Sequence, residues 1–485
     1  MRLKDETLLR TQAYIDGQWV DADSGETLAV TNPATGATIA EIAKCGTAET
    51  RRAVDAASRA LVTWRQKTVK ERAAILRKWF DLVIEYQDDL AQIMTAEQGK
   101  PLPEAKAEVV YGANYIEWFA EEAKRIYGDT IAPPSIDKRI IVIKQPIGVV
   151  ACITPWNLPS AMLTRKIAPA LAAGCTVVCK PANATPFSAF AVVELLERAG
   201  VPAGVVNIVA GNTREIGAEM TSNPTVRKLS FTGSTAVGKL LMEQCASTVK
   251  RTSMELGGNA PFIVFDDADI DQAIEGAMAS KFRNAGQTCV SANRILVQEG
   301  VHDEFTKKLA AASADLKMGD GTEAGVLIGP LITEDAANDV VEIVNDAVSK
   351  GAQIVVGGGR SDLGACFVTP TVLTGVTDDM RMFHEEIFGP IAPIYKFKTE
   401  EEAIALANDT EFGLASYIYA RDIGRIWRVS EGLEYGIVGV NAGMISNEMA
   451  PFGGVKESGQ GREGSRYGLD DYLEIKAITI GGIDR

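Results

Sequence analysis

Short runs of β-branched and other apolar residues alternate with helical stretches from about residue 140 onward, and this alternation constrains the fold most strongly. The runs recur about every 25 to 30 residues, at 147–154, 176–180, 205–211, 228–233 and 252–256. Such spacing is typical of βα units, in which parallel strands lie side by side and helices cover both faces. We therefore expect a doubly wound α/β layer that binds its ligands beyond the carboxyl ends of the strands.

The chain is long enough for more than one domain, since 485 residues exceed what one hydrophobic core usually serves. A second alternation begins near 261–267 and continues through strands around 293–298, 352–356, 415–420 and 435–440. Apolar positions at helical spacing predict helices over 47–64, 71–96 and about 104–127, and we expect Gly128 to close the last. Two strand-like segments, 138–145 and 472–482, have no helices of their own. They pair with each other or with another subunit, and we favour the second.

The net charge of −15 disfavours nucleic acid and anionic membranes as partners, and no run of about 18 apolar residues is present. Seven cysteines, an odd number in a long chain, indicate mostly reduced thiols and a cytoplasmic protein. Cys175 and Cys179 lie in apolar strand sequence, which favours core packing over a paired-cysteine site. His302 and His384 are the only histidines, so we expect no metal site.

The segment from Gly233 to Leu240 resembles a phosphate-binding P-loop except at its last position. Leu240 stands where a Ser or Thr hydroxyl would bind magnesium, which argues against a nucleoside-triphosphate hydrolase or a phosphotransferase. A glycine turn into a helix N-terminus could still bind a pyrophosphate, and a purely structural turn is equally compatible with the sequence.

Cys289 and Glu255 are the residues that best suit covalent chemistry. Small and polar residues precede Cys289 in Phe282-Arg-Asn-Ala-Gly-Gln-Thr-Cys289, whereas an inert buried cysteine would more often lie among Val, Ile and Leu. Glu255 ends a strand just before a glycine pair, a loop-edge position that suits a general base. A solvated acid is the alternative for Glu255.

Seven motifs occur in one order along the chain: Pro155-Trp-Asn157, Lys180-Pro, Phe231-Thr-Gly-Ser-Thr235, Glu255-Leu-Gly-Gly-Asn259, Gly286-Gln-Thr-Cys289, Glu386-Ile-Phe-Gly-Pro390 and Pro451-Phe-Gly-Gly454. With them the sequence resembles the aldehyde dehydrogenase superfamily over essentially its whole length, and most closely its succinate-semialdehyde dehydrogenases. The resemblance implies a Rossmann-like cofactor domain at 1–126 and 146–256 and an α/β catalytic domain at 257–457. A small β oligomerisation arm, at 127–145 and 470–485, would then assemble a homodimer or homotetramer.

The resemblance implies that the Cys289 thiolate attacks the aldehyde and forms a thiohemiacetal. Its oxyanion would accept hydrogen bonds from the Asn157 side chain and from the N–H of Cys289. Glu255 would then activate the water that hydrolyses the thioester, and it could also deprotonate the thiol. Lys166 and Glu463 would carry protons away from Glu255. A non-catalytic descendant would be expected to lack Cys289 or Glu255.

The resemblance also assigns a nicotinamide dinucleotide. Ser234 would bind the pyrophosphate, Glu386 the nicotinamide ribose and Lys180 the adenosine ribose. Further residues implied to line the cofactor cleft are Pro155, Trp156, Gly233 and Phe388. The sequence departs from NAD⁺-specific relatives at Asn183, where they commonly place a glutamate that repels a 2′-phosphate. We therefore expect NADP⁺ to be preferred and NAD⁺ to be possible.

A carboxylate on the aldehyde would need planar bidentate partners in so acidic a protein, and arginine has that geometry. Arg165, Arg283 and Ser446 stand where succinate-semialdehyde dehydrogenases hold the substrate carboxylate. We expect succinate semialdehyde as substrate, with a glutarate-semialdehyde dehydrogenase or a broader aldehyde dehydrogenase as the alternative, since one methylene discriminates by only about 1–3 kcal/mol.

Some relatives carry a second cysteine two residues after the nucleophile. Ser291 occupies that place here, so we expect no disulfide switch beside Cys289.

Overall fold

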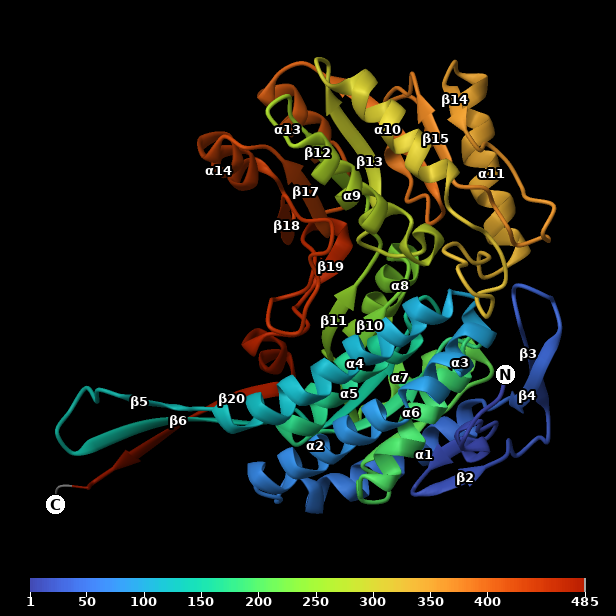
Figure 1. Cartoon of the computed structure of the whole chain (residues 1–485). Coiled ribbons are helices and arrows are strands. Elements are labelled where there is room, and N and C mark those ends of the chain that lie inside the picture. Colours follow the sequence, from blue (N-terminus) through green and yellow to red (C-terminus); the bar gives the residue numbers. More distant parts are fainter. Residues whose placement is uncertain (484–485) are drawn as a thin grey trace.

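The computed structural model describes residues 1–483, which form two α/β lobes and a three-stranded arm that projects from the first lobe (Figure 1). Each lobe is built on its own sheet, with eight strands in the first and seven in the second. Among the described residues, no helix is long and apolar enough to cross a lipid bilayer.

The sheet of the first lobe has the order β19-β11-β10-β7-β8-β9-β1-β2. Its five central strands are parallel: β7 (Val149–Ile153), β8 (Thr176–Lys180), β9 (Val206–Ile208), β10 (Val226–Thr232) and β11 (Arg251–Glu255). The antiparallel edges are β1 (Ala13–Ile15), β2 (Gln18–Val20) and β19 (Gly459–Gln460). This parallel core confirms the doubly wound layer expected from the alternation of runs.

Helices cover both faces of this sheet. Alternate strand residues point to opposite faces, so Val150 and Cys152 join one hydrophobic cluster while Val149 and Ala151 join another. One face carries α1 (Thr47–Trp64), α7 (Thr213–Ser222) and α8 (Thr235–Ala246). The other carries α2 (Val69–Glu85), α3 (Gln87–Gln98), α4 (Leu102–Glu122), α5 (Pro159–Ala173) and α6 (Pro186–Arg198). A separate hairpin, β3 (Thr27–Thr31) and β4 (Thr38–Ala43), lies outside the main sheets.

The second lobe has the strand order β14-β15-β16-β13-β12-β17-β18 and is parallel except for β14, which runs antiparallel to β15. Its strands are β12 (Ala260–Val264), β13 (Ala292–Gln298), β14 (Gln353–Val356), β15 (Thr371–Thr374), β16 (Ile391–Phe397), β17 (Ala415–Tyr419) and β18 (Ile437–Val440). Its helices are α9 (Ile270–Lys281), α10 (His302–Ala314), α11 (Glu334–Ser349), α12 (Arg381–His384), α13 (Glu400–Asn408) and α14 (Ile423–Gly432). A second hydrophobic core fills this lobe.

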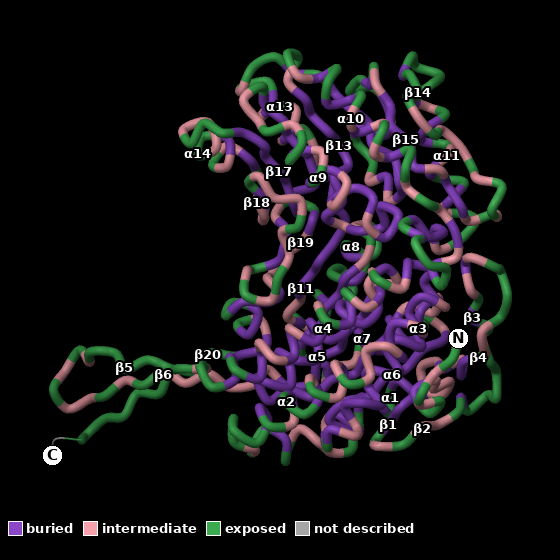
Figure 2. Tube along the Cα trace, in the orientation of Figure 1, coloured by how far each residue is buried: buried purple, intermediate pink, exposed green. Residues whose placement is uncertain are grey.

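The arm consists of β5 (Asp129–Ile131), β6 (Lys138–Pro146) and β20 (Leu473–Gly481) in the order β20-β6-β5. The strand β20 pairs antiparallel with β6 along its whole length, from Leu473 opposite Pro146 to Gly481 opposite Lys138. The sequence left open whether the segments 138–145 and 472–482 pair with each other or with another subunit. The structure shows that they pair with each other. Most of the arm is exposed or half-buried (Figure 2). The arm was expected to extend to residue 485, and its last two residues lie outside the described part.

Two local predictions were wrong, and some strands were not predicted. The helix expected over 71–96 is two helices, α2 and α3, which meet at Tyr86. Gly128 does not close a helix, because α4 ends at Glu122 and passes into a short 3₁₀ turn. Gly128 instead packs against β6, where a side chain would collide with the Val142 carbonyl oxygen. The strands β15 and β16 were not predicted.

Candidate active site

Cys289 lies between two cavities that meet at its side chain. One, here called the arginine cavity, has a volume of about 190 Å³ and is lined by Cys289, Arg165 and Arg283 among others. The other, the glycine cavity, has a volume of about 230 Å³ and is lined by Cys289, Gly233 and Gly257 among others. Cys289 is half-buried, whereas Cys175 and Cys179 are fully buried and form no disulfide with any described residue, as expected for core residues. The thiol is thus open to ligands on two sides.

The segment before Cys289 is a strained 3₁₀ turn over Arg283–Gly286. Asn284 and Ala285 have φ values of 51° and 54°, the left-handed region that side chains other than glycine rarely adopt. Such strain persists only where the surrounding structure enforces it, and it gathers at functional sites. The turn faces the loop of Asn157, to which it is hydrogen-bonded.

Asn157 lies in the loop between β7 and α5 and is buried beside the nucleophile segment. Its amide Nδ2 donates to the Gln287 carbonyl oxygen at 3.0 Å. Its own carbonyl oxygen accepts from Lys100 Nζ at 2.8 Å and from Asn284 Nδ2 at 3.0 Å. An amide nitrogen carries two N–H bonds, so one remains for a ligand in the glycine cavity, which Asn157 lines.

Glu255 ends β11 and lines the glycine cavity together with Cys289. The following glycines allow the chain to pass close to the nucleophile, because a Cβ atom at Gly258 would collide with the Cys289 carbonyl oxygen. Burial and the nearby charge of Glu463 raise the pKa of Glu255 well above its usual value. Its Oε2 has no hydrogen-bond partner among residues 1–483. Glu255 is therefore a proton acceptor of enhanced basicity aimed into the cavity.

Glu463 and Lys166 form a buried ion pair behind Glu255. Lys166 Nζ lies 2.6 Å from Glu463 Oε1 and also donates to Ser230 Oγ at 3.1 Å. On the other side, Arg165 lies 2.7 Å from Glu463 Oε2. Burial alone would raise the pKa of Glu463, but these two cations outweigh it and the pKa is lowered. Glu463 is thus held ionised next to the more basic Glu255.

The thiol of Cys289 is a weak acid in this arrangement. Burial, together with the carboxylates of Glu386 and Glu255, raises its pKa to about 12, although Arg165 acts in the opposite sense. The nucleophilic form of a cysteine is the thiolate, so Cys289 needs a base to become reactive. Glu255, in the same cavity, is such a base.

The glycine cavity has the features of a dinucleotide site. The helix α8 begins directly after Ser234, whose side chain makes no capping hydrogen bond, so its N-terminal N–H groups can bind a pyrophosphate. Glu386 Oε1 accepts from the Gly258 N–H at 2.9 Å, and burial raises the pKa of Glu386 to about 7. The remaining expected cofactor residues in its lining are Pro155, Trp156, Gly233 and Phe388. These residues fit a nicotinamide dinucleotide.

Lys239, which occupies the P-loop lysine position, pairs instead with Glu457 at 2.6 Å on the surface. The predicted strand, turn and helix around Gly233 are present, but this lysine is turned away from the turn and toward the carboxylate. A pyrophosphate at this turn would therefore be bound by backbone N–H groups rather than by a lysine.

Lys180 and Asn183 line neither cavity. They lie at the carboxyl end of β8 and in the turn that follows, where ligands of such sheets bind. Asn183 donates through Nδ2 to the Gly211 carbonyl oxygen at 2.7 Å and accepts from the Gly211 N–H at 3.2 Å. Lys180 donates to the Pro181 carbonyl oxygen at 3.0 Å, and burial lowers its pKa to about 8.

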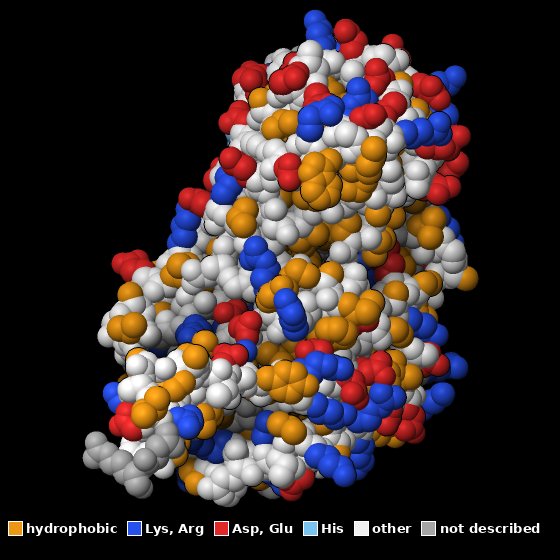
Figure 3. Space-filling model, turned by 90° about the vertical axis from the view of Figure 1, so that its left-hand side faces the viewer, with side chains coloured by type: hydrophobic (Ala, Val, Ile, Leu, Met, Phe, Trp, Pro, Cys, Tyr) orange, Lys and Arg blue, Asp and Glu red, His pale blue; other side chains and the backbone are white. Residues whose placement is uncertain are grey.

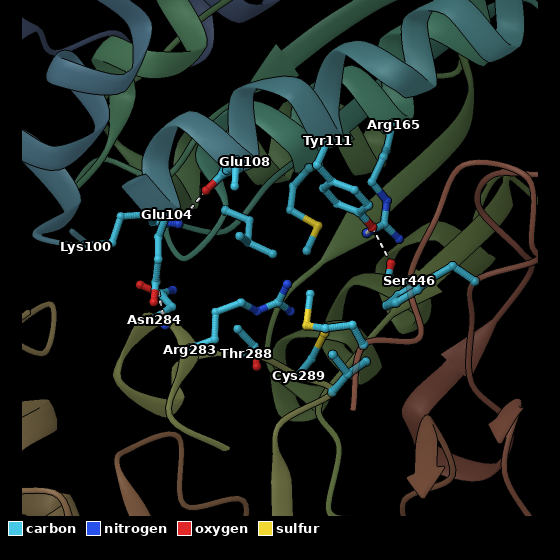
Figure 4. Close-up of a pocket in the computed structure, with 16 residues that line it drawn as sticks. Lys100, Glu104, Glu108, Tyr111, Arg165, Arg283, Asn284, Thr288, Cys289 and Ser446 are labelled. Atoms are coloured by element: carbon cyan, nitrogen blue, oxygen red, sulfur yellow. Dashed lines mark hydrogen bonds and ion pairs between the residues drawn. The ribbon is translucent and has the colours of Figure 1, made fainter. Parts of the chain in front are cut away.

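The arginine cavity brings together the three residues expected to bind a carboxylate, and Figure 4 shows them around Cys289. The Arg165 guanidinium lies over the Phe452 ring, 4.1 Å from its centre, and is already paired with Glu463. Arg283 reaches into the cavity from the other side, and its buried Nε has no hydrogen-bond partner in the described part of the chain. Ser446 contacts the Tyr111 hydroxyl group. Arg283 is thus the more available of the two arginines.

Several cavity residues were missed at the sequence level, and most of them come from α4 and the turn before it. They are Lys100, Glu104, Glu108, Tyr111 and Asn284. Lys100 pairs with Glu108, and Glu108 Oε1 accepts the N–H groups of Ser160 and Ala161 at the start of α5. Glu104, Glu108 and Tyr111 are four and three residues apart within α4, which places them on one helical face.

Within residues 1–483, no group of three or more His, Cys, Asp or Glu side chains could hold a metal ion. The sequence over residues 19–478 matches the model of the aldehyde dehydrogenase family. Across all of both chains, it is 63% identical to 3-sulfolactaldehyde dehydrogenase of Pseudomonas putida and 62% identical to glutarate-semialdehyde dehydrogenase of Pseudomonas aeruginosa. It is also 62% identical to the NADP⁺ succinate-semialdehyde dehydrogenase GabD of Escherichia coli, over 99% of this chain and 100% of that one.

Solved structures agree with this likeness. The crystal structure of succinate-semialdehyde dehydrogenase from Burkholderia pseudomallei superposes with a TM-score of 0.98, at 62% sequence identity, over 99% of this chain and 100% of that one.

Proposed function

Because the chain belongs to the aldehyde dehydrogenase family, we propose that it oxidises succinate semialdehyde to succinate, with NADP⁺ as the preferred cofactor. The observation that carries the proposal is the position of Cys289 where two cavities meet, one lined by two arginines and the other suited to a dinucleotide. A substrate held by its carboxylate in the first cavity presents its aldehyde carbon to the thiol.

The reaction begins with proton transfer from the Cys289 thiol to Glu255. The thiolate adds to the aldehyde carbon, and the free N–H of the Asn157 amide and the Cys289 N–H stabilise the resulting oxyanion. A bound nicotinamide dinucleotide supplies the hydride acceptor that turns the thiohemiacetal into a thioester. Ser234, Glu386 and the residues around them would hold it.

Once the proton taken from Cys289 has left Glu255, its carboxylate acts a second time, as general base. Its carboxylate takes a proton from water, the hydroxide adds to the thioester carbon, and the acid leaves while Cys289 departs as thiolate. Glu463 and Lys166 lie behind Glu255 and would carry its proton onward through their ion pair. The high pKa of Glu255 serves both steps, because a stronger base takes a proton more readily.

The preference for NADP⁺ is supported by three features. A relative that is 62% identical is named for NADP⁺. Asn183 carries no charge and its amide is held by Gly211, so nothing at this position repels a 2′-phosphate. The ammonium group of Lys180 lies on the same edge of the sheet and would attract one.

The substrate itself has three candidates among close relatives, whose identities of 62% to 63% do not rank them. All three names denote aldehydes that carry an anionic group at the far end, which the arginine cavity suits. Glutarate semialdehyde is the first alternative. A sulfonate is the second, since its three oxygens would find donors on two sides of the cavity, Arg283 on one side and the hydrogen-bonded group of Arg165, Tyr111 and Ser446 on the other.

The test is a set of initial rates with succinic semialdehyde, glutaric semialdehyde, sulfolactaldehyde and propanal, each with NADP⁺ and with NAD⁺. We expect kcat/KM to be highest for succinic semialdehyde with NADP⁺ and lowest for propanal. A higher value for another anionic aldehyde would reassign the substrate, and equal values for propanal would remove the role of the arginines.

Arg283→Ala gives the matching variant. Because Arg283, unlike Arg165, forms no ion pair with a carboxylate among the described residues, its loss should raise KM for the semialdehyde by about tenfold or more and leave KM for propanal nearly unchanged. Arg421→Ala, which removes an exposed guanidinium paired with Asp269, is the control and should change neither value.

We further propose a cytoplasmic homo-oligomer, a dimer or tetramer, assembled through the arm. A three-stranded sheet without a core of its own is marginally stable in isolation. Its isoleucines are exposed, with Ile475 at 72%, Ile478 at 37% and Ile480 at 41%. The side of the molecule that carries the arm exposes hydrophobic side chains in several places (Figure 3). A second copy of the chain would cover them.

A further inference from the structure

Glu104 contacts the nucleophile segment from the first turn of α4. Its Oε2 accepts the Asn284 N–H at 2.8 Å, and its side chain lines the arginine cavity with Arg283 and Cys289. Figure 4 shows the carboxylate beside Asn284, at the end of the cavity where Arg283 originates. None of the steps proposed above uses Glu104.

The hydrogen bond from Asn284 fixes a strained turn. Asn284 has a φ of 51°, and its backbone needs a partner that holds it in the left-handed region. From this position its Nδ2 donates to the carbonyl oxygens of Asn157 at 3.0 Å and Gln287 at 3.2 Å. The carbonyl of Gln287 in turn accepts from the Asn157 amide. Glu104 is therefore connected, through Asn284 and Gln287, to the Asn157 amide that is proposed to face the oxyanion.

The charge of Glu104 also acts on Arg283. The pKa of Glu104 is raised by burial, while the Asn284 hydrogen bond and the charges of Lys100 and Arg283 lower it. Arg283 is thus close enough to interact electrostatically, although the two side chains form no ion pair within 4 Å. A carboxylate in this place reduces the positive potential that Arg283 presents to a substrate anion.

We propose that Glu104 is a positioning residue with two effects. Its carboxylate holds the Asn284 turn, which orients Asn157. Its negative charge weakens the binding of the substrate anion to Arg283. The second effect rests on the proposed function. Weaker binding of the anion helps the product to dissociate, because the oxidised product carries two carboxylates and must leave a cavity lined by two arginines.

Two substitutions separate the effects. Glu104→Gln keeps an oxygen that can accept the Asn284 N–H but removes the charge. It should lower KM for succinic semialdehyde by about fivefold and leave KM for propanal unchanged, the size expected for one nearby charge that is partly screened. Glu104→Ala removes the acceptor as well, and kcat should fall by about tenfold or more for both aldehydes, as misplacement of a catalytic group does.

Glu117→Gln is the control on the same helix, since Glu117 is exposed and pairs with Arg77 away from both cavities. It should alter neither constant. Thermal unfolding of each variant is followed in parallel, and Glu104→Asp replaces Glu104→Ala if the alanine variant does not fold. The shorter carboxylate should lower kcat in the same way.

An unchanged ratio of the two KM values in Glu104→Gln would overturn the charge effect. Wild-type kcat in Glu104→Ala, or in Glu104→Asp where it is used, would overturn the positioning effect. If the wild-type enzyme does not prefer anionic aldehydes to propanal, the proposed substrate class fails. The kcat comparison still decides whether Glu104 positions Asn157.

Discussion

The charge of Glu463 is the side-chain charge that most strongly raises the pKa of Glu255. In Glu463→Gln this charge is absent, and Arg165 and Lys166 lose their carboxylate partner, so all three changes lower the pKa of Glu255. Glu255 works as a carboxylate, and activity falls when pH drops through its pKa. We therefore expect the acid limb of the kcat profile to move to lower pH, measured from about pH 5 to 9.

Glu97→Gln is the control for this shift. Glu97 is also fully buried and has a pKa raised by burial to about 8, but it accepts the N–H groups of Phe187 and Ser188 and lines neither cavity. Its substitution should leave the acid limb in place. A limb that stays fixed or rises in Glu463→Gln would contradict the electrostatic coupling to Glu255.

Asn157 is expected to act only while charge develops on the substrate oxygen. Asn157→Ala should lower kcat by about 10²–10³-fold, or roughly 3 kcal/mol of barrier, because the oxyanion loses one donor in a buried site. The dissociation constant of NADP⁺, measured by fluorescence titration, should stay within about twofold, since binding of the cofactor precedes that charge. A variant that loses cofactor affinity while keeping kcat would contradict this role.

At the same scale, the sequence pointed to residues with distinctive chemistry and missed residues whose place in a cavity depends on packing. Cys289, Glu255 and Asn157 line one cavity, and their proposed roles stay a prediction. Glu104 and Glu108 on a helix have the spacing of an ordinary solvated face. Only the packing of α4 against α5 and the nucleophile segment turns them inward, and no local pattern encodes that contact.

The connection between β11 and β12 joins the two lobes through Gly257 and Gly258, and its path is set by the nucleophile. In Gly258→Ala, the new Cβ would collide with the backbone carbonyl of Cys289, which cannot move aside as a flexible side chain can. We expect kcat to fall by at least about tenfold, because small displacements of reacting groups lower the rate of the chemical step strongly.

Gly217→Ala in α7 provides the matched control, since a Cβ there would meet no atom within 4 Å. It should preserve kcat and raise the free energy of unfolding by up to about 1 kcal/mol, as alanine favours a helix over glycine. Equal kcat values in both variants, measured by steady-state assay, would show that the connection tolerates a side chain.

Elements were predicted best where burial dominates. The strands β7 and β8, in the middle of the first sheet, are buried along their whole length, and apolar residues dominate both. The strand β16 contains Pro393, and proline inside a strand pattern normally argues against a strand. The pairing partner of a strand was harder to predict than the strand itself. The strands β6 and β20 lie more than 320 residues apart, and their sequences do not indicate which sheet edge each strand joins. The domain limits given above stay a prediction.

At the scale of the whole molecule, the arm is the part that we expect to contact another chain. It projects from the first lobe, and in the described chain the outer edge of β20 pairs with no other strand (Figure 1). Ile478 and Ile480 point to the same face of the arm, because side chains two residues apart in a strand do so. An exposed apolar face next to an open edge strand is a surface on which strands of another chain can add.

The double variant Ile478→Glu/Ile480→Glu should therefore lower the mass measured by light scattering after gel filtration to that of one chain, 51.9 kDa, because two charges cannot be buried unpaired in an interface. Val348→Glu/Ile354→Glu changes residues of similar exposure, 41% and 43%, on α11 and β14, and should keep the wild-type mass. A monomeric wild-type protein would disprove assembly through the arm. Since both cavities are lined by residues of one chain, the dissociated variant should still oxidise aldehyde, and its kcat reports whether assembly also rigidifies the site.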